Sequence, residues 1–167
     1  PERIKRFFGT LITFTFFSGV IIVILCFFFN KLIVRWFFEG IAFIPYVLIG
    51  LITLIFLSLH TLHQKFLLVM QQGRKLTIIN IIFSFALISM NLFFIGVLKL
   101  DAIGFLYASL LINFSYVIFF IFDLHKNNLL KIDLNFIMLY KSLKYSIPLL
   151  PHYLSTHFAG FFSKILL

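Results

Sequence analysis

The stretch FFGTLITFTFFSGVIIVILCFFF, residues 7–29, decides the fold because it contains no charged residue. As an α-helix it would be about 34 Å long at about 1.5 Å per residue, which exceeds the roughly 30 Å hydrocarbon core of a bilayer. It is too long for the apolar part of a secretory signal peptide and has no small-residue cleavage site. The stretch therefore predicts a transmembrane helix.

Four more hydrophobic runs follow, at residues 41–59, 76–98, 105–122 and 145–167. Each is close to the length of about 20 residues that a spanning helix needs, and none alternates in polarity as barrel strands would. With 62% hydrophobic residues, 11% charged residues and 26 Phe, the chain cannot cover a water-facing surface. The sequence predicts an all-α, polytopic transmembrane helix bundle of about five spans. Its ends, Pro1 and an apolar run without a polar exit, lead us to expect a piece of a longer protein.

The basic residues lie almost entirely between the hydrophobic runs, although the net charge is +9. Connections on alternate sides of the membrane hold ten and three Lys and Arg residues. The positive-inside rule makes the N-terminal end and the connections after residues 59 and 122 cytoplasmic. This placement indicates membrane topology and contact with anionic lipids, and it argues against a nucleic-acid partner.

Two cytoplasmic connections are expected to be partly helical. Residues 60–72 should continue the second helix past the membrane and turn at Gly73. Residues 128–144 mix Lys with Leu, Ile and Phe, which favours a helix in the membrane interface, either as a linker between two bundles or as an anchored loop. Pro148 and Pro151 then bend the chain, whether a helix begins at them or earlier.

Polar residues recur on one side of each expected helix, which predicts a polar interior. The stripes are Tyr46, Gly50, Thr53, His60 and Gln64; Thr77, Asn80, Ser84 and Asn91; and Ser109, Asn113 and Tyr116. The last run carries His152, Ser155, Thr156, Ala159, Gly160 and Ser163 on one side, with Lys164 at its margin. That face either packs on a neighbouring helix or lines a hydrated cavity. Lys164 at depth calls for an anion or water, unless its amine reaches the interface.

The motifs of common enzyme classes are absent from the sequence, which has no P-loop, no dinucleotide turn, no His-Glu-x-x-His and no Gly-x-Ser-x-Gly. The five acidic residues lie in or beside expected loops, and no two of them form a carboxylate pair. His60 and His63 have the spacing of two metal ligands but lack a third, so we interpret them as polar helix-end residues near lipid head groups. Cys26 is the single cysteine. The sequence predicts a non-enzyme without a cofactor.

The segment KYSIPLLPHYLST, residues 144–156, resembles the helix that opens the second half of polysaccharide transporters. These are the O-antigen and exopolysaccharide flippases of the multidrug, oligosaccharidyl-lipid and polysaccharide exporter superfamily. The segments QGRK at 72–75 and LKLDAIGF at 98–105 look like loops after the fourth and fifth family helices. Near residue 164 many members carry an Asp-Arg pair, whereas this chain has Ser163-Lys164, so any role of that acid is in doubt.

The resemblance implies that residues 1–123 hold helices three to six of an N-terminal lobe in a protein of about twelve to fourteen spans. Residues 124–144 would be the cytoplasmic linker and residues 145–167 the first helix of the C-terminal lobe. The implied function is a flippase in the bacterial cytoplasmic membrane that moves an undecaprenyl-pyrophosphate-linked oligosaccharide between leaflets for surface polysaccharide synthesis. A polysaccharide polymerase and a chain-length regulator are further implied partners.

Lys164 is the first candidate for contact with the lipid-linked head group, joined by His152 and Thr156. Arg74 and Lys75 either hold the cytoplasmic rim near anionic head groups or act only as topology signals. Two alternatives stay open. A membrane-embedded polysaccharide polymerase would ordinarily bring a long external loop, and a drug or cation antiporter would be favoured by acidic residues deep in the spans.

Overall fold

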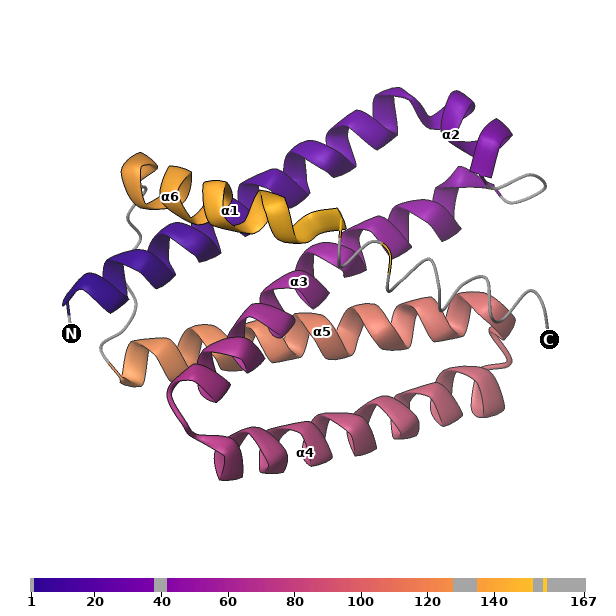
Figure 1. Cartoon of the computed structure of the whole chain (residues 1–167). Helices are drawn as coiled ribbons and strands as arrows, with labels where there is room; N and C mark the ends of the chain where they lie inside the picture. The colour runs from indigo at the N-terminus through magenta and orange to yellow at the C-terminus, as the bar shows by residue number, and fades with distance from the viewer. Residues whose placement is uncertain (1, 38–41, 128–134, 152–154, 156–167) are drawn as a thin grey trace. The chain divides into compact units, whose positions relative to one another are not determined.

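The computed structural model of the chain describes residues 2–37, 42–127, 135–151 and 155. Every regular element within these ranges is a helix, which confirms the predicted all-α class (Figure 1). Contacts between Cα atoms divide the chain into two compact units, one formed by residues 1–11 and 131–167 and the other by residues 12–130.

Among the described residues, four helices are long and apolar enough to cross a membrane, so the chain is a multi-pass membrane protein. Their bounds are α1 (Glu2–Phe28), η1 with α3 (Phe43–Val47 and Leu48–Val69), α4 with η2 (Gly73–Asn91 and Leu92–Val97), and α5 (Asp101–Lys126). They match the first four predicted spans. The fifth predicted span, residues 145–167, lies mostly outside the described residues.

The predicted extension of the second span past residue 59 is confirmed, but the turn after it is not at Gly73. It lies at Gln71, whose φ of 57° is left-handed. The Gln71 N–H donates to the Leu68 carbonyl at 3.0 Å and the Gln72 N–H donates to the Leu67 carbonyl at 2.9 Å, which is the pattern of a Schellman cap. Gly73 instead begins α4.

The connection between the first two spans, expected to be a loop, contains a short helix, α2 (Asn30–Phe37). The Asn30 side-chain amide donates to the Phe27 carbonyl at 2.8 Å and so satisfies one of the free carbonyls at the end of α1. This second helix follows the first after a single turn residue, Phe29.

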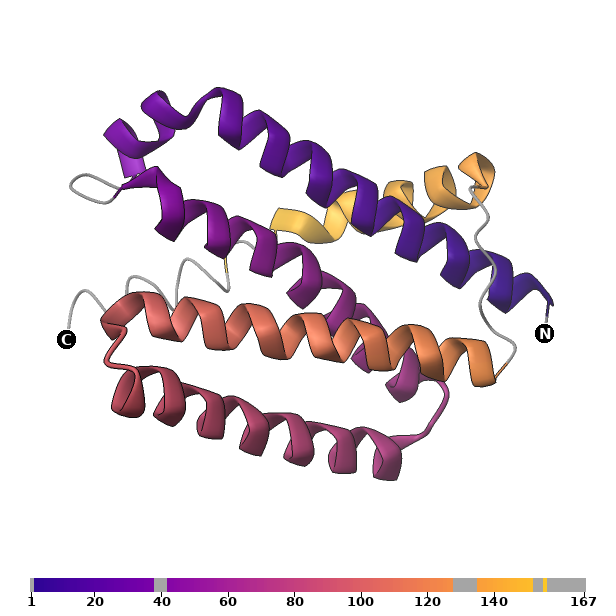
Figure 2. The same cartoon turned by 180° about the vertical axis from the view of Figure 1, so that it is seen from behind.

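The core of residues 12–130 lies where α5 packs against both α3 and α4, as both views of the ribbon show (Figure 1 and Figure 2). Nearly every fourth side chain of α5 is buried, which forms a continuous ridge along one side of the helix. These residues are Ala108, Ile112, Tyr116, Phe120 and Leu124. Leu59, Phe66 and Leu67 of α3 are buried as well.

In the other unit, α6 (Phe136–Ser146) confirms a helix in the segment predicted to lie in the membrane interface. Asn135 caps it by accepting hydrogen bonds from the N–H groups of Ile137 and Met138, each at 3.1 Å. A 3₁₀ turn, η3 (Ile147–Leu149), follows directly and contains Pro148. The helix therefore begins before the proline, which has no N–H to continue the α-helical ladder.

Candidate functional site

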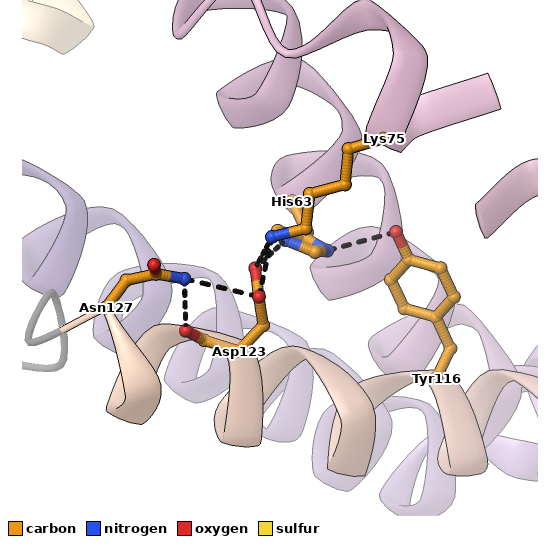
Figure 3. A network of polar contacts seen from close by, with 5 residues as sticks. All are labelled: His63, Lys75, Tyr116, Asp123 and Asn127. Atoms are coloured by element: carbon orange, nitrogen blue, oxygen red, sulfur yellow. Dashed lines mark hydrogen bonds and ion pairs between the residues drawn. The ribbon is translucent and has the colours of Figure 1, made fainter. Parts of the chain in front are cut away.

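A buried carboxylate near the end of α5 organises the described part of residues 12–130. The Lys75 ammonium of α4 donates to both Asp123 oxygens, at 2.6 and 2.8 Å (Figure 3). The Asn127 amide, one turn further along α5, donates to the Asp123 carbonyl at 2.7 Å and to its carboxylate at 3.2 Å. Only 8% of Asp123 is exposed, so Lys75 supplies the countercharge that a buried anion requires.

His63 of α3 connects this ion pair to the aromatic core. Its Nε2 lies 3.3 Å from Asp123 Oδ2 and its Nδ1 lies 3.0 Å from the Tyr116 hydroxyl (Figure 3). Since a carboxylate only accepts, Nε2 carries the proton, and the Tyr116 hydroxyl donates to Nδ1 of a neutral ring. The His63 ring also stacks on Phe120 with centroids 4.5 Å apart. Both ring nitrogens of this fully buried histidine are therefore in hydrogen bonds, and its ring packs against an aromatic side chain.

A second chain of hydrogen bonds, uncharged throughout, runs beside the first. His60 Nδ1 lies 3.1 Å from Asn113 Oδ1, so it donates, and His60 Nε2 then accepts from the Gln64 amide at 2.9 Å. The same amide donates to Asn80 Oδ1 at 2.9 Å. The His60 ring stacks on Tyr116 with centroids 3.5 Å apart, which joins the two chains. We call the nine residues the polar cluster: His60, His63, Gln64, Lys75, Asn80, Asn113, Tyr116, Asp123 and Asn127.

The polar cluster ties α3, α4 and α5 together at one end, which the basic loops predict to be cytoplasmic. At the other end α3 and α5 enclose a largely apolar cavity of about 580 Å³, which includes Tyr46, Gly50, Thr53, Phe105 and Ser109 in its lining. Directional polar contacts thus hold the three helices at one end, and at the other end α3 and α5 line an open cavity. Such an arrangement fixes the three helices relative to one another at the end that holds the polar cluster.

Both His60, which helical spacing placed on an inner polar face, and His63, which it did not, are members of this cluster. Their predicted position near lipid head groups stays a prediction. Both ring nitrogens of each are already in hydrogen bonds. No group of three His, Cys, Asp or Glu side chains that could hold a metal ion occurs in the described ranges.

The sequence predicted Asp123 beside a loop, and the structure places it in the last turn of α5, where it is buried. The predicted span ended at Phe122, four residues before α5 ends at Lys126. Had the helix been continued to Lys126, Asp123 would have fallen on the stripe of Asn113 and Tyr116, ten residues after the first and seven after the second. The sequence therefore contained a signal for its buried position.

The structure separates the predicted site residues. Lys75 belongs to the polar cluster, whereas the neighbouring Arg74 is exposed. Lys164, His152 and Thr156 lie outside the described residues, so their predicted contact with a head group stays a prediction.

The polar face of α4, formed by Thr77, Asn80, Ser84 and Asn91, borders a shallow pocket of about 310 Å³. Its lining combines hydroxyl and amide groups with Phe85 and Ile88, and contains no charged side chain. Ser84 is exposed. The buried Asn91 Oδ1 has no hydrogen-bond partner among the described residues.

No family model, no curated protein and no solved structure matches the chain.

Proposed function

We propose that the chain is part of a flippase that moves an undecaprenyl-pyrophosphate-linked oligosaccharide from the inner to the outer leaflet of a bacterial cytoplasmic membrane by alternating access. The observation that carries the proposal is the polar face of α4. It lies in a helix that is long and apolar enough to span the bilayer. An uncharged polar face inside a span favours contact with water or with a polar passenger over contact with lipid tails.

The chemistry of this face suits sugars. Hydroxyl and amide groups both donate and accept hydrogen bonds, as sugar hydroxyls do, and Phe85 supplies an apolar surface beside them. The resemblance of residues 144–156 to polysaccharide transporters agrees with this interpretation.

The charges favour a flippase over a cation antiporter. Asp123 is the one acid shown to be buried in the described part of the chain, and Lys75 neutralises it. A site that binds and releases a cation needs a carboxylate that is free to do so. The polar cluster is therefore better suited to holding three helices together than to exchanging ions.

Replacing Ser84 with Leu tests the proposal, because the larger apolar side chain fills the polar pocket and removes a hydroxyl. In the full-length protein we expect export of surface polysaccharide to fall about tenfold, the effect of losing roughly 1.4 kcal/mol of stabilisation for the passenger. Ser84→Thr keeps the hydroxyl and should retain export. Ile82→Leu, on the other side of α4, is the matched control.

The location of the blocked intermediate distinguishes the alternatives. A flippase defect leaves single lipid-linked repeats on the inner leaflet, whereas a polymerase defect leaves them on the outer leaflet. Unchanged export by the Ser84→Leu protein at normal abundance would contradict the proposal, as would repeats that accumulate outside.

A further inference from the structure

A groove of about 630 Å³ lies between α4 and α5, away from the polar face of α4. Ile78 and Ile82 of α4 line it together with Phe119 of α5. Ile78 and Ile82 are 49% and 58% exposed, so the groove is open and apolar along about one turn of α4. The apolar parts of three further side chains line the end of the groove where α4 begins; these belong to Gln72, Arg74 and Lys75. We call it the basic groove.

The two cations at this end of the groove, Lys75 and Arg74, differ in whether an anion of the protein neutralises them. The Lys75 ammonium forms an ion pair with Asp123, so its charge is neutralised within the protein. Arg74 is exposed, and no hydrogen bond or ion pair links its guanidinium to the rest of the described chain. Gln72 beside it is exposed and offers an uncharged amide donor. At the end of the groove where α4 begins, the Arg74 guanidinium is therefore a cation that no anion of the described residues neutralises. The apolar lining of the groove starts beside it.

We propose that the basic groove binds an anionic phospholipid, with its phosphate on Arg74 and Gln72 and an acyl chain along Ile78, Ile82 and Phe119. The planar guanidinium matches two phosphate oxygens at once, which a single ammonium cannot do. The basic loops predict this end of α4 to be cytoplasmic, where basic pockets between spanning helices bind anionic head groups. The apolar channel descends from the cation into the span, as an acyl chain does from its phosphate.

This lipid site does not depend on the proposed transport, and its test involves no transport. The chain is purified in detergent and placed in nanodiscs that contain equal amounts of phosphatidylglycerol and phosphatidylcholine. Lipids that stay bound after release from the discs are counted by native mass spectrometry. We expect phosphatidylglycerol to be retained about fivefold over phosphatidylcholine, the preference that one cation near a membrane surface provides.

Three variants locate the site. Arg74→Gln should abolish the preference for phosphatidylglycerol. Arg74→Lys should keep part of this preference, because the positive charge remains but the paired N–H donors of the guanidinium are lost. Ile82→Trp should reduce retention of both lipids by filling the channel. Lys65→Gln is the matched control, because it removes an exposed cation from the same end of α3 without touching the groove.

Equal retention of the two lipids by the unaltered protein would overturn the proposal. So would a preference that survives Arg74→Gln, or one that Lys65→Gln reduces equally, because the effect would then reflect the overall charge of the surface. Helical content by circular dichroism shows whether each variant is folded, and Arg74→Lys tests the proposal even if Arg74→Gln is unstable.

Discussion

Replacing Asp123 with Leu is expected to lower the free energy of unfolding by about 3 kcal/mol, the lower end of the range for breaking a buried ion pair. The variant leaves the Lys75 ammonium without an anion and His63 Nε2–H without an acceptor. The Lys75 side chain is 35% exposed, so water offsets part of the loss. Unfolding is followed by circular dichroism as a denaturing detergent is titrated into mixed micelles.

The control for this variant removes both charges. Lys75→Met combined with Asp123→Leu removes both charges of this pair, and replacing a whole buried pair by apolar residues is often neutral. We expect the double variant to recover most of the lost stability. A double variant no more stable than Asp123→Leu alone would show that the charge pair is not what the single variant disrupts.

Replacing His63 with Ala is expected to cost about 3–4 kcal/mol, because two losses combine. The ring is fully buried and stacks on Phe120, so its removal leaves a cavity in the core. Its two nitrogens contact Tyr116 and Asp123, which lose a partner each. The same detergent titration measures the effect.

His60→Ala is the matched control for His63→Ala, since it removes the same side chain one turn earlier in α3, at a position that is only half-buried. Its expected cost is about half as large. Combining His63→Ala with Tyr116→Phe should cost about 1 kcal/mol less than the sum of the single variants, because both remove the same hydrogen bond. Equal costs at the two histidines, or strictly additive effects, would contradict the assigned geometry.

The sequence predicted the class of fold because a spanning helix needs only length and low polarity, which residues 7–29 show without any knowledge of neighbours. It predicted less well where a helix end depends on local geometry. Gly73 looked like the turn residue, yet the left-handed conformation falls on Gln71, where the Schellman hydrogen bonds form.

The polar interior was predicted in outline and not in its contacts. Helical spacing put His60, Gln64, Asn80, Asn113 and Tyr116 on inner faces, and the structure brings them together. Spacing within one helix does not determine how two helices are aligned along their axes. The pairing of Lys75 with Asp123 depends on how α4 and α5 align, so it could not be predicted from either helix alone.

Cysteine accessibility in native membranes tests most directly the central claim that the polar face of α4 lines a hydrated path. In a Cys26→Ala background, Ser84→Cys is compared with Ile82→Cys on the lipid-facing side of the same helix. A charged thiol reagent reacts with thiolates, which form in water and are suppressed in hydrocarbon. We predict that the cysteine at 84 is labelled at least about tenfold faster than the one at 82, while equal rates at both positions would contradict the claim.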